Sequence, residues 1–131
     1  MLKKENRFDS YAYRISSRPL DASVTTLEEG QWVTLNASGK VIVSDGTKKS
    51  FMALSSKRDG RDNLGAGQNC TYVYGHGEFS TNMVDAAQTY APMTALKVTT
   101  GGKLTVATAS DTIVAYALSP ILDGFVRIML V

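Results

Sequence analysis

The sequence predicts a single, mainly β domain with little helix. The chain has 131 residues, of which 44% are hydrophobic and 20% charged, and this length and balance suit one folded domain with its own core. Glycines and other turn-forming residues divide residues 22–131 into many short apolar runs. Short strands between turns spaced by about 8 to 12 residues are typical of a β-sandwich or a small β-barrel.

Residues 1–19 are predicted to form an extended arm ahead of a β domain at 20–131. The apolar residues of this segment are too few for a core, and Tyr11, Tyr13 and Ile15 alternate as in a strand. Two interpretations remain open: a frayed terminus, or an arm that lies across a neighbouring subunit and uses its tyrosines for contact. The residues expected to contact a partner are Arg7, Phe8, Tyr11, Tyr13 and Arg14.

The first strands of the β domain form a predicted hairpin. Residues 31–35 place Trp32 and Thr34 on one face, and a four-residue turn at 36–39 leads into a strand at 40–43. The turn contains a glycine, which adopts a positive φ without strain. Further short strands are expected at 51–54, 70–74, 78–81, 96–99, 103–106, 114–118 and 125–131.

The second half of the chain contains another hairpin signal. Residues 100–102, with two glycines, join the strands at 96–99 and 103–106. The strand at 125–131 is almost continuously apolar, which predicts burial on both faces. A weak helix at 84–89 is the one helical candidate, and we find no internal repeat in the sequence.

Composition indicates no disulfide, membrane segment or nucleic-acid partner. The single cysteine, Cys70, is expected to be a buried thiol in a strand. The apolar stretches at 113–118 and 125–131 are far shorter than the about 20 residues that a membrane helix needs. The basic residues at 1–7 precede no apolar stretch, so cytoplasmic synthesis without a secretory signal is expected. A net charge of +2 is small for a nucleic-acid-binding domain.

We expect no catalytic, cofactor or metal site. His76 is the only histidine, and an arrangement with Ser80 and Asp85 is formally possible, but no motif positions these residues for catalysis. The glycines at 65–67 and 75–77 lack the strand, spacing and helix of a phosphate-binding loop. The expected sets of catalytic, cofactor-binding and metal-binding residues are therefore empty.

The polar loop at 57–63 has three interpretations: a solvated loop, a charged contact with a partner, or a cation site. Arg58 and Arg61 repel a cation, so the metal interpretation is the weakest.

Three aromatic residues, Tyr72, Tyr74 and Phe79, stand on neighbouring predicted strands. Such rings stack on bases in single-strand-binding proteins, whereas in most domains they pack in the core. The basic residues nearby in sequence among the later strands are only Lys97 and Lys103, so the sequence predicts no basic groove and no nucleic-acid partner.

Several segments from residue 30 onward carry a shared pattern of apolar strands and glycine turns: 30–35, 38–41, 51–54, 93–98, 102–105, 114–118 and 124–128. In these segments the chain resembles the decoration, or cement, proteins of tailed-bacteriophage heads. The segment at 113–116, where that family often has a glycine, instead contains alanine in this chain.

The resemblance implies a β-tulip or small barrel that binds the outside of an assembled capsid and holds neighbouring capsomers together. It implies the major capsid protein as partner, a homo-oligomer with a trimer favoured, a place on the virion exterior, and no enzymatic activity. Two other classes stay open. One is another virion part, such as a tail-tube or fibre-base protein, and the other is a trimeric β-fold nucleotide hydrolase, whose characteristic motifs this chain lacks.

Overall fold

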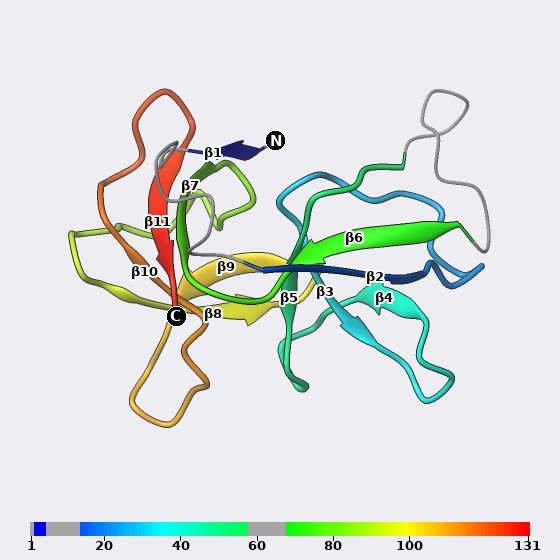
Figure 1. Cartoon of the computed structure of the whole chain (residues 1–131). Helices are drawn as coiled ribbons and strands as arrows, with labels where there is room; N and C mark the ends of the chain where they lie inside the picture. The colour runs from blue at the N-terminus through cyan, green and yellow to red at the C-terminus, as the bar shows by residue number, and fades with distance from the viewer. Residues whose placement is uncertain (1, 5–13, 58–67) are drawn as a thin grey trace.

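The structure is a computed structural model, and it describes residues 2–4, 14–57 and 68–131. All regular secondary structure in these ranges is β, which confirms the predicted mainly β single domain (Figure 1). The weak helix predicted at 84–89 is wrong. Its residues form a turn in which the Asp85 carboxylate accepts the Ala87 N–H at 3.0 Å, because aspartate competes for backbone donors more effectively in turns than in helices.

Eleven strands of the described residues form two antiparallel sheets. The first sheet has the order β1-β7-β11-β10-β8-β9 and the second has the order β2-β6-β5-β3-β4. Figure 1 shows these sheets side by side, the first on the left and the second on the right. The strands are β1 (Leu2–Lys4), β2 (Ile15–Pro19), β3 (Trp32–Leu35), β4 (Val41–Val43), β5 (Phe51–Ala53), β6 (Asn69–Val73), β7 (Gly77–Thr81), β8 (Ala95–Thr99), β9 (Lys103–Val106), β10 (Ala115–Ala117) and β11 (Val126–Leu130).

Strands β3 to β11 begin and end within one residue of the predicted ranges. The last of them corrects one expectation, because β11 is buried on one face and not on both. Val126, Ile128 and Leu130 are buried, whereas Arg127 between them is exposed and lies 3.9 Å from the Glu78 carboxylate on β7. Within the described residues this face stays partly open to solvent, so the strand alternates as in a sheet that faces water on one side.

The described parts of residues 1–19 belong to the sheets. Leu2–Lys4 pairs with β7, and all five residues of Ile15–Pro19 pair with β6. These ranges are therefore edge strands and not an arm outside the β domain. Of the residues predicted to contact a partner, Arg14 lies within the described residues and Arg7, Phe8, Tyr11 and Tyr13 lie outside them.

The two sheets repeat one topology, which the sequence did not reveal. We call β2 to β6 the N-terminal unit and β7 to β11 the C-terminal unit. In each unit the first strand pairs with the fifth, the fifth with the fourth, the fourth with the second, and the second with the third. The chain therefore contains the same five-stranded arrangement twice, with β1 as an additional edge strand.

Matching hydrogen bonds support this repeat in detail. Leu20, just after the first strand of the N-terminal unit, forms a parallel bridge with Val41, and Val84 forms the same bridge with Leu104 in the C-terminal unit. The next N–H in each case, from Asp21 or Asp85, donates to the carbonyl of that bridged partner. In the described residues these bridges do not close either sheet into a barrel, so of the predicted mainly β architectures the small closed barrel is not the one formed.

The turns of the two units also correspond. Gly39 and Gly102 occupy the same position of the second-to-third-strand turn, with φ of 75° and 68°. Gly30 and Met93 precede the second strand of their units with φ of 92° and 67°, and each N–H donates to the last residue of the fourth strand. Met93 is thus a non-glycine residue in a left-handed conformation that its counterpart reaches with glycine.

Replacement of Met93 by glycine is expected to stabilise the protein by about 1 kcal/mol, because glycine relieves the left-handed strain. The Met93 side chain is 59% exposed, so its loss removes little buried surface. Urea unfolding measures the change in the free energy of unfolding. Met93→Ala is the control, since it removes the same side chain but keeps the strain, and a Met93→Gly protein no more stable than Met93→Ala would refute the explanation.

Two hydrophobic clusters lie on opposite faces of the β2–β6 sheet, because successive residues of a strand point to opposite faces. One face packs against the C-terminal unit through Trp32, Met52 and Val73. The opposite face is covered by the segment that follows β2, through Leu20, Val24 and Leu27. The first cluster holds residues of both units, so the two units form one domain.

The units also approach each other closely through their backbones. The Trp32 N–H donates to the Gly102 carbonyl at 2.8 Å, and the Gln31 side-chain amide donates to the Gly101 carbonyl at 2.8 Å. The turn of the C-terminal unit therefore lies directly against the start of β3 in the N-terminal unit.

Candidate functional site

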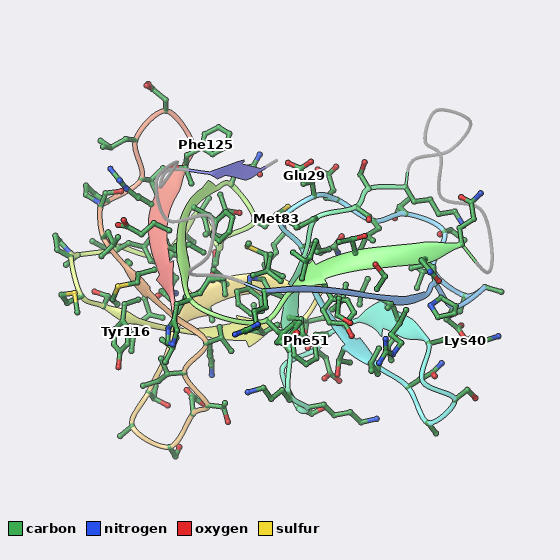
Figure 2. The ribbon with its side chains drawn as sticks, in the orientation of Figure 1. Glu29, Lys40, Phe51, Met83, Tyr116 and Phe125 are labelled. Atoms are coloured by element: carbon green, nitrogen blue, oxygen red, sulfur yellow. The ribbon has the colours of Figure 1, made fainter. Side chains whose placement is uncertain are left out.

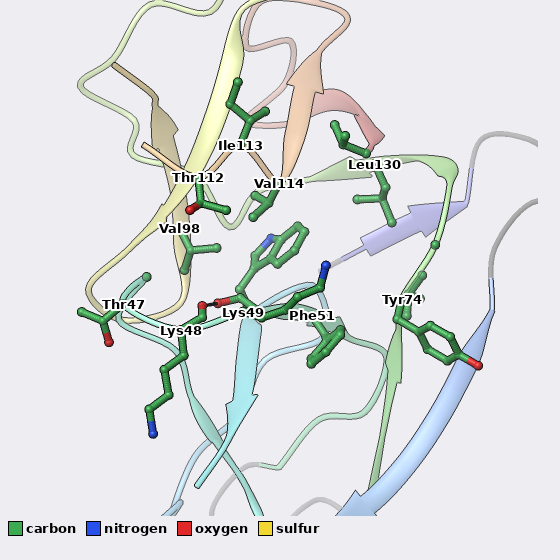
Figure 3. Close-up of a pocket in the computed structure, with 16 residues that line it drawn as sticks. Thr47, Lys48, Lys49, Phe51, Tyr74, Val98, Thr112, Ile113, Val114 and Leu130 are labelled. Carbon is green, nitrogen blue, oxygen red and sulfur yellow. Dashed lines mark hydrogen bonds between the residues drawn. The ribbon is translucent and has the colours of Figure 1, made fainter. Parts of the chain in front are cut away.

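A cleft of about 450 Å³ opens between the two units. Figure 3 shows Ile113, Val114 and Leu130 of the C-terminal unit on one side and Lys48, Lys49 and Phe51 of the N-terminal unit on the other. The lining residues are Trp32, Gly46, Thr47, Lys48, Lys49, Ser50, Phe51, Val73, Tyr74, Gly75, Val98, Thr112, Ile113, Val114, Leu130 and Val131.

The cleft is built from equivalent segments of the two units. The N-terminal unit contributes the loop before its fourth strand, 46–50, and the end of its fifth strand, 73–75. The C-terminal unit contributes the corresponding loop at 112–114 and the corresponding strand end at 130–131. The cleft therefore lies where the two copies of the repeat face each other.

Exposed apolar side chains gather around the mouth of this cleft. Six large hydrophobic side chains are exposed in the described residues, and three of them, Tyr74, Ile113 and Val131, line the cleft. A fourth, Ile15, is 56% exposed and pairs directly across the sheet with Val73, which also lines the cleft. Clustering of such side chains in one place is typical of a surface that binds a partner. We call these four residues, Ile15, Tyr74, Ile113 and Val131, the apolar rim.

Positive charge lies beside the apolar rim. The charged side chains in the cleft lining are those of Lys48 and Lys49, which are exposed. The adjacent carboxylate of Asp45 is already bonded, since it accepts the N–H and the hydroxyl of Thr47 at 3.0 and 2.7 Å. These two hydrogen bonds lower the pKa of Asp45.

The acidic group on the opposite side of the cleft is also engaged. Asp111 accepts the backbone N–H and the hydroxyl of Thr108, each at 2.7 Å, and lies 3.0 Å from the Lys97 amine. The Thr108 hydrogen bonds, followed by that of Lys97, lower the pKa of Asp111 to about 2. Asp111 is therefore paired with Lys97, whereas Asp45 retains its negative charge and interacts electrostatically with Lys48, which also lowers its pKa.

Trp32 forms part of the cleft wall and is 3% exposed. Its indole N–H is the one buried side-chain polar group without a hydrogen-bond partner within residues 14–57 and 68–131. It is also the only tryptophan of the chain, so its fluorescence reports directly on this region.

Arg14 is the predicted contact residue that the structure describes. Its side chain is exposed, and its carbonyl accepts the Tyr74 N–H at 2.9 Å beside the apolar rim. Tyr74 stood out in the sequence as an aromatic residue, whereas the loop residues of the cleft did not, because they come from segments far apart in the chain. The adjacent exposed Lys48 and Lys49 were the strongest signal available.

The structure does not bring together His76, Ser80 and Asp85, the three residues of the formally possible catalytic arrangement. His76 is exposed in the turn before β7, and Ser80 lies four residues farther along that extended strand, so their Cα atoms are about 13 Å apart. Asp85 instead caps its own turn.

The three aromatic residues singled out in the sequence, Tyr72 on β6, Tyr74 just after it and Phe79 on β7, have different surroundings. Tyr72 and Phe79 are buried, and the Tyr72 ring lies 4.9 Å from that of Phe51. Tyr74 alone of the three is exposed, and it belongs to the apolar rim.

Of the polar loop at 57–63, the structure describes Lys57, whose amine donates to the Val24 carbonyl at 3.1 Å. The remainder of that loop lies outside the described residues. No group of three or more His, Cys, Asp or Glu side chains in the described ranges could hold a metal ion.

Cys70 is a fully buried thiol on β6, as the sequence predicts. Burial raises its pKa to about 11 from 9.0. The folded state thus holds the proton more tightly than the unfolded state, and the stability from this group is present below pH 9 and lost as the pH rises toward 11.

We expect Cys70 to resist a disulfide reagent at pH 8 in the folded protein, because both burial and protonation suppress thiolate attack. Release of thionitrobenzoate from Ellman's reagent measures the reaction. The protein unfolded in guanidinium is the control and should react with one equivalent within minutes. Equal rates in the two states would contradict the burial of Cys70.

Comparison of the chain with protein-family models, with curated proteins and with solved structures found no match. Within the described residues, no helix has the length and apolar character needed to cross a membrane.

Proposed function

We propose that this chain is a structural protein of a tailed-phage virion, which binds the outer surface of the assembled capsid and stabilises the contacts between capsomers. Its partner is the major capsid protein, and its action is binding without catalysis. The observation that carries the proposal is the apolar rim around the cleft between the units. The resemblance of residues 30–131 to capsid decoration proteins supports the identity of the partner.

The rim suits a protein partner for a physical reason. Burial of apolar surface stabilises association by roughly 25 cal/mol per Å², and aromatic side chains such as Tyr74 often carry much of the energy in protein interfaces. Lys48 and Lys49 add charge at the edge of this surface, where they influence specificity and the rate of association.

A capsid presents the same site many times, so a decoration protein gains from multivalency. A trimer with three clefts would engage neighbouring capsomers together, and its avidity would exceed the affinity of one cleft without new contacts. This is why the proposal includes a homo-oligomer, with a trimer favoured, on the virion exterior.

Co-sedimentation with expanded heads tests the proposal. The heads are assembled from the major capsid protein of the genome that carries this chain, without their decoration protein. Saturable binding at a fixed number of copies per capsomer supports the proposal, as does a higher temperature of head disassembly. Absence of binding, together with rings or stalks formed by the purified protein alone, would instead favour a tail-tube or fibre-base protein.

A further inference from the structure

We infer that the cleft binds a segment of a partner protein in which an apolar side chain stands next to a carboxylate. The inference rests on the proposed function in one respect only, namely that the cleft contacts a protein. It adds the chemistry that the cleft recognises.

The size of the cleft fits a short segment. Its volume of about 450 Å³ lies within the roughly 300 to 1,000 Å³ of pockets that hold small ligands. The mouth is flanked by Tyr74 and Ile113, which are 43% and 37% exposed. An entering apolar side chain would therefore bury both its own surface and that of the rim.

The two sides of the cleft differ in chemistry although they are equivalent in topology. On the C-terminal side, the loop and strand end present Ile113, Val114 and Leu130. On the N-terminal side, the equivalent loop presents Lys48 and Lys49 (Figure 3). A segment that satisfies both sides needs an apolar group and a negative charge close together.

Charge complementarity selects a carboxylate over an amine. The charged side chains of the lining are Lys48 and Lys49. Asp111 is paired with Lys97, and Asp45 interacts electrostatically with Lys48, so within the described residues Lys49 is the lining lysine without an ion pair. A carboxylate brought by the partner would be attracted by the positive charge of Lys49, whereas an amine would be repelled.

Trp32 supplies a direct readout, because it lines the cleft and no other tryptophan contributes to the emission. The probe is a capped five-residue peptide in which leucine stands between two acidic residues, titrated to millimolar concentration. Two control peptides carry lysines in place of the acids, or alanine in place of leucine. We expect a saturable change of Trp32 emission with the first peptide, and at least tenfold weaker binding of both controls.

A matched pair of variants locates the binding. Lys49→Glu should lower the affinity for the acidic leucine peptide at least tenfold. Lys103 is an exposed lysine that does not line the cleft, so Lys103→Glu should leave this affinity unchanged. Melting curves of both variants verify the fold. Affinity of the unmodified protein should also fall with added salt, a readout that needs no variant.

Equal binding of the three peptides, no saturable change, or equal effects of Lys49→Glu and Lys103→Glu would each overturn the inference. Failure of the proposed function looks different. If the peptide binds and heads do not, the cleft chemistry holds and the capsid assignment fails. If heads bind and Lys49→Glu changes neither heads nor peptide, the capsid assignment holds and the cleft chemistry fails.

Discussion

Gly46→Ala is expected to lower the free energy of unfolding by about 2 to 5 kcal/mol. A Cβ at this position would clash with the Val98 carbonyl oxygen and lie 3.1 Å from its carbon, both of them backbone atoms of the other unit. Relief of that clash requires the two units to move apart, at a typical cost of about 1 to 3 kcal/mol for overpacking. The φ of +91° adds about 1 to 2 kcal/mol for a residue with a side chain.

Urea unfolding followed by Trp32 fluorescence measures this effect, since Trp32 lies in the cluster shared by the units. Gly124→Ala is the matched control, because its φ of +82° carries the same backbone strain and nothing lies within 4 Å of its Cβ. A Gly46 variant as stable as the Gly124 variant would contradict the close packing of the units at this loop.

Gly102→Ala is expected to cost about 1 to 3 kcal/mol more than Gly39→Ala, although the two glycines occupy the same place in the repeat. Their φ values of +68° and +75° impose similar strain on alanine. A Cβ on Gly102 would lie 2.5 Å from the Trp32 carbonyl oxygen, whereas a Cβ on Gly39 meets no atom within 4 Å. The difference arises because only the turn of the C-terminal unit packs against the other unit.

Parallel urea denaturation of the two variants measures this difference, and the shared strain cancels in the comparison. The same glycine variants also test the repeat, since each is the counterpart of the other. Equal destabilisation would show that the turn containing Gly102 does not support the contact between units that the structure describes.

The strands were predictable from the sequence because they depend on local patterns. Glycine turns at 36–39 and 100–102 marked both hairpins, and alternation at Trp32 and Thr34 placed both residues on one buried face, as observed. The burial of Cys70 also followed from its position within an apolar strand.

The repeat was not predictable because few identities mark it. At the hairpin turns, Gly39 and Lys40 match Gly102 and Lys103, but most equivalent positions of the second and third strands carry different residues. Topology depends on which strands pair, and many apolar sequences satisfy the same pairing.

The cleft was not predictable for a related reason. Its residues lie on loops that are distant in sequence, such as 46–50 and 112–114, and only the pairing of the sheets brings them together. Figure 2 shows Lys40 at the far side of the N-terminal unit from Tyr116 of the C-terminal unit. A lysine in the sequence can therefore lie far from the cleft between the units, and its position along the chain does not tell the distance.

The most direct test of the account compares two substitutions at exposed apolar residues in the co-sedimentation with expanded heads. Ile113 belongs to the apolar rim, whereas Leu122, 62% exposed, does not line the cleft. We predict that Leu122→Asp binds heads to the same number of copies per capsomer as the unmodified protein, and that Ile113→Asp binds at least tenfold more weakly. Equal binding of the two variants, or no binding of the unmodified protein, would contradict the account.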